Sequence, residues 1–208
     1  MLAELTRYYS DRAYSTALDE ISKHDDPFRV LIGTVLSQRT RDALTAAAEQ
    51  ALFREYPDAV SLSAASRGHI EQLIRQVGFY RTKARAIREI ARLLLERHDG
   101  KVPDELDALL ALPLVGRKTA NCVLVFGFGK PAIPVDTHVH RISNRLGWAM
   151  TKSPEETERA LSAALPREHW LEVNEVFVLH GQNICRPVTP RCGICPVACC
   201  CSWNMKRK

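Results

Sequence analysis

The residues best placed to do chemistry begin with a lysine whose setting would make its amine reactive. Lys118 lies in the segment LPLVGRKTA (residues 112–120), and a helix is expected to start at Gly116 or Arg117. In the first turn of a helix, the helix dipole and partial desolvation both lower the pKa of a lysine. A neutral amine is a nucleophile, whereas a charged lysine beside Arg117 would bind phosphate, and this segment alone leaves both interpretations open.

An aspartate and two histidines follow in the segment PVDTHVHR (residues 134–141). Asp136 precedes a helical pattern, so its carboxylate is predicted to be the N-cap, where backbone amides keep it ionised. An ionised carboxylate can stabilise positive charge on a sugar or accept a proton from an amine. His138 and His140 are two residues apart and cannot share one face of a helix, which argues against a metal site there.

Most of the seven cysteines crowd the C-terminal end of the sequence. Six, two and five residues separate four of them, which are Cys185, Cys192, Cys195 and Cys201. Four thiolates in a short loop suit a [4Fe–4S] cluster or a tetrahedral zinc ion. The spacing favours iron–sulfur because only one Cys-x-x-Cys pair occurs, but it leaves zinc open. Cys199 and Cys200 blur the register of the fourth ligand, and Cys122 stands alone.

The elements that must position these residues are helices. No segment shows sustained alternation of apolar and polar residues, so the sequence predicts eight to ten short helices and no sheet. Asp26–Pro27 and Ser153–Glu156 have the pattern of a helix N-cap followed by proline, and the second adds a capping box. Apolar residues between 84 and 94 recur at helical spacing up to a C-cap at Asp99–Gly100.

The composition indicates a globular protein with a mildly basic charge. The 208 residues are 46% hydrophobic, which excludes a disordered tail, and 29 Lys and Arg against 24 Asp and Glu leave a formal charge of +5. This charge points only weakly to an anionic partner. Four arginines share one face of the helix around residue 88, where a solvated face is favoured over a nucleic-acid contact: Arg81, Arg85, Arg88 and Arg92.

Apolar runs and terminal signals point to a soluble protein of the cytoplasm. No window approaches the roughly 20 apolar residues of a membrane span. The first ten residues, MLAELTRYYS, lack the pattern of a secretory signal peptide. Clustered cysteines in such a chain are expected to remain reduced and to bind a metal.

Together, the three segments resemble the endonuclease III family of DNA base-excision glycosylases, within the helix-hairpin-helix superfamily that carries a catalytic aspartate. The resemblance runs from about Phe28 to Cys201 and includes the hairpin, Val-Asp-Thr-His and the cysteine spacing. It implies catalytic roles for Lys118 and Asp136. It also implies a [4Fe–4S] cluster bound by Cys185, Cys192, Cys195 and Cys201.

The same resemblance implies which residues contact DNA. Gln38, in LSQRTRD (residues 36–42), matches the glutamine that fills the gap left by the flipped nucleotide. Phe79, in GFY (residues 78–80), matches the wedge opposite the lesion, although taken alone it would be interpreted as a core aromatic. The other expected DNA contacts are Val115, Gly116, Arg117, His138, Arg141, Arg186 and Arg191.

One position departs from the family pattern. The family hairpin reads LPGVGRKTA, and Leu114 stands where it has its first glycine. Glycine there permits unusual backbone dihedrals and close approach to phosphate. The departure puts the strength of DNA binding in doubt more than the chemistry, because Gly116 and Lys118 stand in register.

The resemblance further implies an all-α fold of two lobes, with Lys118 and Asp136 projecting from different lobes toward a groove. Residues 25–130 would form a six-helix barrel that contains the helix-hairpin-helix motif. Residues 1–24 and 131–208 would form the second lobe, with the cluster loop near its C-terminal end. A damaged base flipped out of the duplex would enter the groove.

The activity implied by the resemblance is that of a bifunctional DNA glycosylase and abasic-site lyase of base excision repair. It would remove oxidised pyrimidines and cleave 3′ of the abasic site by β-elimination. We expect a monomer, associated with nucleoid DNA rather than a membrane, whose partner is double-stranded DNA with a damaged base or an abasic site. The alternatives are an adenine- or thymine-mismatch glycosylase, which usually lacks a lysine at position 118, and a non-catalytic DNA-binding iron–sulfur module, which would need neither Lys118 nor Asp136.

Overall fold

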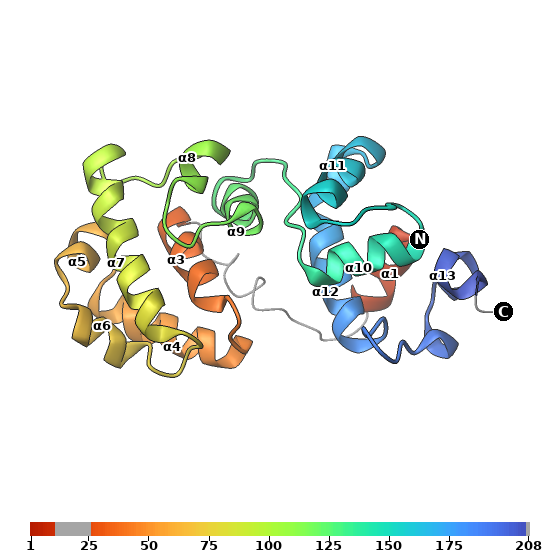
Figure 1. Cartoon of the computed structure of the whole chain (residues 1–208), viewed down its shortest axis with the longest axis horizontal. Coiled ribbons are helices and arrows are strands. Elements are labelled where there is room, and N and C mark those ends of the chain that lie inside the picture. Colours follow the sequence, from red (N-terminus) through yellow and green to blue (C-terminus); the bar gives the residue numbers. More distant parts are fainter. Residues whose placement is uncertain (11–25, 207–208) are drawn as a thin grey trace. The chain divides into compact units, whose positions relative to one another are not determined.

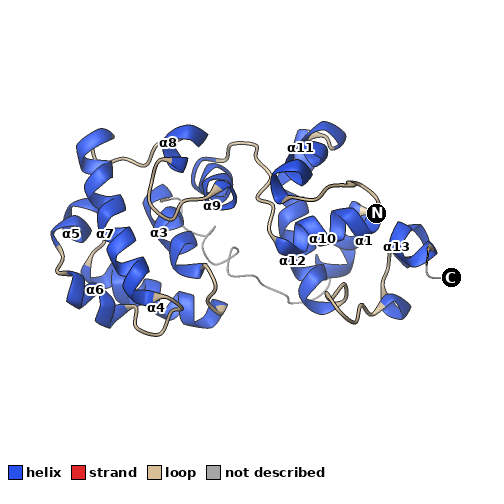
Figure 2. Cartoon of the chain, viewed as in Figure 1, coloured by secondary structure: helices blue, strands red, loops and turns tan. Residues whose placement is uncertain are grey.

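A computed structural model describes residues 1–10 and 26–206, which form helices joined by loops and turns. These residues contain no β-strand (Figure 2), so the all-α prediction is confirmed. They contain twelve α-helices, more than the eight to ten that the sequence predicted, because helices of four to six residues are too short to show a periodicity. Four α-helices are this short, of which α8 and α9 were expected from the helix-hairpin-helix motif: α5 (Ala59–Ala64), α8 (Leu106–Leu110), α9 (Arg117–Cys122) and α13 (Ser202–Met205). No helix in the described ranges is long and apolar enough to cross a membrane.

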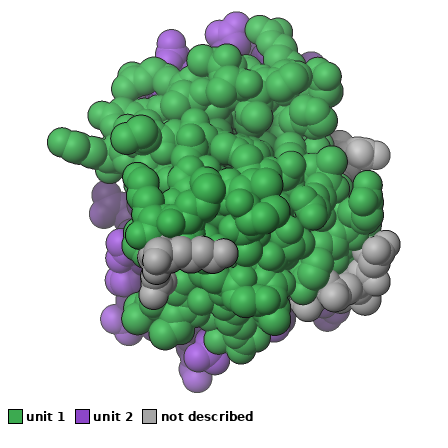
Figure 3. Space-filling model, turned by 90° about the vertical axis from the view of Figure 1, so that its right-hand side faces the viewer, with its two compact units in different colours: residues 1–16, 131–208 green, residues 17–130 purple. Residues whose placement is uncertain are grey.

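The chain divides into two compact units (Figure 3). Unit 2 comprises Ala17–Lys130, and unit 1 comprises Met1–Thr16 together with Pro131–Lys208. The domain boundary that the sequence placed between residues 24 and 25 lies outside the described residues. Each unit has its own buried apolar core.

A buried helix, α3 (Pro27–Ser37), organises unit 2 (Figure 1). The Asp26 carboxylate caps it by accepting a hydrogen bond from the amide of Phe28 at 2.9 Å, and Pro27 occupies its first turn, as predicted. Every residue from 30 to 36 is buried, which is typical of a helix surrounded by others. The elements packed against it are α4 (Asp42–Glu55), α7 (Tyr80–Arg97), α9 and the π-helical turn η1 (Val123–Gly127).

The long helix α7 packs against α5 and α6 (Arg67–Leu73) through its apolar face. The predicted apolar positions between 84 and 94 are buried, and the helix ends at Arg97, just before the left-handed residues Asp99 and Gly100. The four arginines on its other face are exposed, as predicted. Arg92 there forms ion pairs with Glu89 and Glu96.

The predicted helix-hairpin-helix consists of α8, a hairpin at residues 111–116 and α9. Gly116 is the N-cap of α9, as predicted. The first helix of the motif, α8, begins at Leu106, two residues after Asp104. The ammonium of Lys130 donates to the carbonyl oxygen of Asp104 at 2.7 Å and pairs with its carboxylate at 2.7 Å, which engages Asp104 outside the helix.

Unit 1 is built around α12 (Trp170–Asn183), which packs against α1 (Leu2–Ser10) and α10 (Thr137–Leu146) (Figure 1). Phe177 is fully buried in its core. The close approach of α10 and α12 requires Gly181, because a Cβ atom there would collide with the imidazole of His138. The short helical elements of this unit are η2 (Arg167–His169), η3 (Cys192–Ile194), η4 (Ala198–Cys200) and α13.

Another α-helix of unit 1, α11 (Pro154–Ala164), corrects one sequence prediction. The Ser153 hydroxyl accepts a hydrogen bond from the Glu156 amide at 3.2 Å, as an N-cap should. The Glu156 carboxylate, however, accepts from the amide of Lys152 at 2.8 Å and not from that of Ser153. The cap is therefore present, and the reciprocal bond of a capping box is replaced by one to the preceding residue.

Candidate functional site

The hairpin before α9 keeps a glycine-like backbone although it carries a leucine. Leu114 has a φ of +59°, in the left-handed region that costs a non-glycine residue about 1–2 kcal/mol. Leu114 is 41% exposed, so burial compensates only in part for this strain. The departure from the family pattern has therefore left the hairpin conformation in place.

Lys118 is the second residue of α9, where the sequence placed it. Arg117 and Lys118 are half-buried, and Gly116 is exposed with nothing within 4 Å of the position that a Cβ would take. Backbone amides at such a helix start can receive a phosphate. Val115 is buried and its amide donates to the carbonyl of Leu112 at 3.2 Å, so it closes the hairpin, and DNA contact at Val115 stays a prediction.

Three loops of unit 2 meet at one hollow, which is lined by Gln38, Arg39, Phe79, Thr82, Lys83 and Leu114. Four non-glycine residues in the described part of the chain have a positive φ, and three of them line this hollow: Arg39, Phe79 and Leu114. Strained residues of this kind cluster at functional sites. The hollow contains both residues that the resemblance assigned to DNA distortion, Gln38 and Phe79.

Phe79 is not the core aromatic that its residue type alone suggested. Its side chain is 64% exposed, and the guanidinium of Arg39 lies 5.7 Å from its ring centroid. An exposed phenylalanine at a loop tip can be inserted between bases, as an apolar wedge requires.

One lysine of the hollow, Lys83, escaped the sequence analysis. It is buried, and its ammonium donates hydrogen bonds to the carbonyl oxygens of Leu36 and Gln38. The sequence did contain a pattern that could have revealed Lys83. It precedes Ile87 by four residues and therefore lies on the apolar face of α7. A lysine on an apolar face is unusual enough to mark a specific role.

Asp136 caps α10, as predicted. Its carboxylate accepts hydrogen bonds from the amides of His138 and Val139, each at 2.8 Å. The buried amide of Asn174 donates to the carbonyl of Pro134 at 2.6 Å and so fixes the chain just before the cap. Asp136 is half-buried in unit 1, whereas Lys118 belongs to unit 2.

His138 and Arg141 follow on α10. Burial lowers the pKa of His138, and the nearby Asp136 charge opposes this effect. All three guanidinium nitrogens of Arg141 already donate within unit 1, to His138 Nδ1 at 3.1 Å and to carbonyls that include those of Gly181 and Cys185. Arg141 thus links α10 to the cysteine-rich loop, and DNA contact by these two residues stays a prediction.

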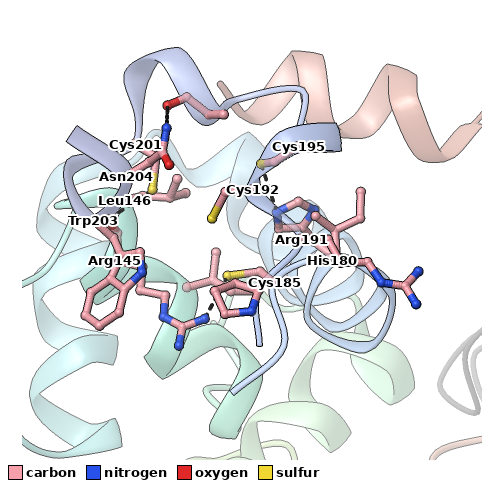
Figure 4. Close-up of a pocket in the computed structure, with 14 residues that line it drawn as sticks. Arg145, Leu146, His180, Cys185, Arg191, Cys192, Cys195, Cys201, Trp203 and Asn204 are labelled. Atoms are coloured by element: carbon pink, nitrogen blue, oxygen red, sulfur yellow. Dashed lines mark hydrogen bonds between the residues drawn. The ribbon is translucent and has the colours of Figure 1, made fainter. Parts of the chain in front are cut away.

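The four cysteines with ligand spacing line a single apolar pocket of unit 1 (Figure 4). They are Cys185, Cys192, Cys195 and Cys201; all are free thiols and half-buried. Their sulfur atoms surround an open space in Figure 4. Cys199 and Cys200 are exposed and outside the pocket lining, and Cys122 is buried in α9. This arrangement separates the predicted ligands from the other three cysteines.

Nitrogen donors approach two of these sulfurs. Arg145 Nη1 lies 3.3 Å from Cys185 Sγ, and His180 Nε2 lies 3.7 Å from Cys195 Sγ. Burial raises the pKa of the Cys195 thiol to about 11, so a positive centre would be needed to hold it as a thiolate. Among the described residues, no three His, Cys, Asp or Glu side chains converge closely enough for one metal ion. Four free thiols that line one pocket are nevertheless the kind of donor set that a [4Fe–4S] cluster uses.

The cysteine-rich loop also carries two of the expected DNA contacts. Arg186 and Arg191 are exposed on it, and Arg191 borders the pocket. The Arg186 carbonyl accepts from Arg145 Nη1 at 2.7 Å, and the Arg191 amide donates to the carbonyl of Ile184 at 2.9 Å. The backbone at both arginines is thus tied to the core of unit 1.

Comparisons with known proteins agree with this geometry. The family model of the HhH-GPD superfamily of base excision DNA repair proteins matches residues 32–167. Endonuclease III of Thermotoga maritima is 52% identical over 185 residues, which cover 89% of this chain and 87% of that protein. The structure of a non-covalent endonuclease III–DNA complex matches with a TM-score of 0.88 at 37% identity, covering 99% of this chain and 94% of that one. A trapped endonuclease III–DNA covalent intermediate matches with a TM-score of 0.82 at 37% identity, covering 100% and 99%.

A helix-hairpin-helix followed by a capped aspartate on a separate unit defines this chain as a protein of the HhH-GPD superfamily. Within that superfamily, the chain belongs to the endonuclease III family.

Proposed function

We propose that this protein is a bifunctional DNA glycosylase and abasic-site lyase of base excision repair. It removes oxidised pyrimidines such as thymine glycol from double-stranded DNA and then cleaves 3′ of the abasic site. The observation that carries the proposal is the lysine in the first turn of α9, in a chain that is 37% identical to one trapped as a covalent intermediate with DNA. A covalent intermediate requires a nucleophile, and Lys118 stands where the family places it.

In the proposed mechanism, the Lys118 amine attacks C1′ of the damaged nucleotide and the base leaves. The Asp136 carboxylate stabilises the positive charge that develops on the sugar and accepts the proton that the attacking amine loses. Two amides hold this carboxylate in place, so it needs no reorganisation during the reaction. The sugar ring then opens: the C1′–O4′ bond breaks, O4′ takes up a proton, and C1′ and the lysine nitrogen form a Schiff base. The Schiff base acidifies the C2′ hydrogen, and removal of this proton expels the 3′ phosphate.

The DNA contacts we propose fall into two groups. Gln38 fills the gap left by the flipped nucleotide, and Phe79 wedges the opposite strand, which their shared hollow and the exposure of Phe79 support. Phosphate contacts come from the start of α9 and from basic side chains, as is usual for sequence-independent binding. These residues are Val115, Gly116, Arg117, His138, Arg141, Arg186 and Arg191.

We propose that the four pocket cysteines hold a [4Fe–4S] cluster. When bound, the cluster would supply cross-links that hold the cysteine-rich loop, which otherwise has only short helical turns. The ligands lie in a loop that is remote in sequence from Lys118, so a structural role suits the cluster better than a catalytic one. A loop held by the cluster in this way would keep Arg186 and Arg191 in fixed positions for contact with DNA.

We also propose two domains, a monomeric state and a location in the cell for this protein. Residues 25–130 form the six-helix barrel domain, and residues 1–24 and 131–208 form the iron–sulfur cluster domain. The protein acts as a monomer in the cytoplasm, on nucleoid DNA. Gel filtration with and without an abasic-site duplex would test the monomeric state.

Borohydride trapping tests the proposed nucleophile. With an abasic-site duplex, the wild-type protein should give a covalent adduct that Lys118→Ala abolishes. Lys101→Ala is the matched control, because Lys101 is an exposed lysine of the same unit. Asp136→Asn should lower the rate of base removal by at least about a hundredfold. Equal trapping by Lys118→Ala and wild type would refute the assignment of Lys118.

A lesion panel tests the substrate class. Duplexes that carry thymine glycol, an adenine mismatch, a thymine mismatch or an abasic site are compared under single-turnover conditions. We expect the highest glycosylase rate on thymine glycol and strand cleavage at the abasic site. Faster removal of a mismatched base, or no cleavage of any duplex, would support the mismatch enzyme or the non-catalytic module instead.

A further inference from the structure

We propose that Lys83 is a positioning residue that locks the loops of Gln38, Phe79 and Leu114 into one rigid platform for opening the duplex. The inference rests on the proposed DNA roles of Gln38 and Phe79. It adds to them a residue that touches no DNA itself and decides whether those side chains can act together.

The Lys83 ammonium is enclosed by oxygen atoms of the Gln38 loop. Only 2% of Lys83 is exposed, and its ammonium donates to the Leu36 carbonyl at 2.7 Å, to the Gln38 carbonyl, and to Thr40 Oγ1 at 3.0 Å. These three acceptors match the three N–H donors of a lysine. The Lys83 side chain therefore connects the first turn of α7 to the residues two positions before and two positions after Gln38.

The charge of Lys83 suits this place although none of these three acceptors is a carboxylate. Leu36 lies in the last turn of α3, where carbonyls lack helical partners and the helix dipole favours a cation. Burial lowers the pKa of Lys83 to about 8, so the amine remains mostly protonated at neutral pH and keeps all its donors. Burying a charged group is costly unless hydrogen bonds satisfy it. The function of Lys83 is therefore sought in the loops that its hydrogen bonds hold in place.

Thr40 extends the lock to the loop of Phe79. Its hydroxyl oxygen also accepts a hydrogen bond from the Gly78 amide at 3.1 Å. The two loops are so close that a Cβ on Gly78 would lie 2.6 Å from the carbonyl oxygen of Arg39. One hydroxyl thus joins the Lys83 ammonium to the residue that precedes the wedge.

Gln38 extends the lock to the helix-hairpin-helix. Its side-chain amide donates to the Leu114 carbonyl at 2.9 Å and to Thr119 Oγ1 at 3.2 Å. The three loops are therefore joined through one continuous set of hydrogen bonds. Each contributes a left-handed residue, and surrounding bonds are what allow such strained conformations to persist.

A rigid platform matters because opening a duplex costs unstacking and unpairing energy. Loops that were ordered only on contact with DNA would add their own ordering cost to this step. Activity on a lesion-containing duplex should therefore depend on Lys83. Cleavage at an abasic site in a single strand, where no base has to be displaced, should not depend on it.

The test compares Thr40→Val with Thr40→Ser, since only serine keeps the hydroxyl. Both are assayed on a thymine glycol duplex and on a single-stranded oligonucleotide with an abasic site. We expect Thr40→Val to lower kcat/KM on the duplex by roughly tenfold and to change single-strand cleavage by less than about twofold. Thr40→Ser should recover most of the duplex activity. Lys83→Met should lower the duplex activity further.

A matched control and an optical readout separate positioning from simple destabilisation. Thr34→Val removes another threonine hydroxyl, one that is buried in α3 and donates to the carbonyl of Val30, so it should affect both substrates alike. With an uncleavable abasic analogue opposite 2-aminopurine, the fluorescence rise on binding should be smaller for Thr40→Val than for wild type.

The outcomes distinguish this inference from the proposed function. If wild type cleaves both substrates and Thr40→Val loses both in parallel or neither, Lys83 and Thr40 are structural and the platform is refuted. If wild type cleaves neither substrate, the proposed function itself fails. Should Lys83→Met not fold, the Thr40 pair still decides the matter.

Discussion

The side-chain amide of Gln38 donates a hydrogen bond to the carbonyl oxygen of Leu114 at 2.9 Å, although the two residues are 76 positions apart. Leu114 is the one clear departure from the family hairpin, and Gln38 is the residue that the family pattern assigns to the gap in opened DNA. The bond joins the loop that we propose enters DNA to the hairpin that we propose faces phosphate. A change at Leu114 can therefore affect Gln38 as well as phosphate binding.

Leu114→Gly is expected to stabilise the protein. The left-handed φ of Leu114 costs leucine more than glycine, and an exposed side chain loses little by being removed. We expect the free energy of unfolding to rise by about 0.5–1 kcal/mol in urea titrations. Leu110→Gly is the control, because Leu110 is similarly exposed but helical, and it should destabilise by about 1 kcal/mol. A loss of stability in Leu114→Gly would contradict the assigned strain.

Phe79→Ala separates stability from function at the proposed wedge. Phe79 is 64% exposed, so the free energy of unfolding should change by less than about 0.5 kcal/mol. The rate of base removal from a thymine glycol duplex should fall roughly tenfold, because the apolar ring no longer supports the opened strand. Val60→Ala removes an equally exposed apolar side chain of α5 and should alter neither quantity. An unchanged duplex rate in Phe79→Ala would exclude the wedge role.

Glu49 on α4 should make stability depend on pH. Its Oε1 is buried without a hydrogen-bond partner, against Gly33 of α3, and burial raises its pKa to about 7. The raised pKa means that the folded protein favours the protonated acid, so stability is greatest below about pH 4.5 and falls as the pH rises toward 7. Glu49→Gln, which stays neutral, should therefore be more stable than wild type by about 3 kcal/mol at pH 8, and by no more than about 1 kcal/mol at pH 5.

The control for that experiment is Glu55→Gln, an exposed position at the end of the same helix. It should show no such difference between pH 5 and pH 8. Urea unfolding at both pH values measures the effect. A Glu49→Gln protein with the same pH profile as wild type would show that the carboxylate is solvated in solution.

Removing single cysteines tests the metal centre. Wild-type protein purified without oxygen should contain about four irons and absorb visible light, as a [4Fe–4S] protein does. Cys195→Ala should lose most of the iron, since it removes a cysteine of the pocket. Cys199→Ala should keep it, because Cys199 is exposed and outside the lining. A colourless protein with one zinc, or iron loss from Cys199→Ala alone, would overturn the ligand assignment.

The parts of the site that could be predicted from the sequence depend on neighbouring residues. The caps at Asp26 and Asp136 are bonds to amides two or three residues away, so residue type and spacing suffice to predict them. The hairpin before α9 follows from a proline and a glycine in the same way. Position 114 was recognised from the family pattern as one that usually holds glycine. Its φ of +59° is the left-handed backbone conformation that glycine adopts more easily than leucine.

The sequence by itself determined the helical class, the main caps, the hairpin and the cysteine spacing, because each is encoded within a few residues. Only the tertiary structure decided the rest. Lys83 is buried and Phe79 exposed, the reverse of what their residue types suggest, because their surroundings come from segments about 40 positions away. The internal bonds of Arg141 likewise depend on packing between segments at least 40 positions apart, which no local pattern specifies.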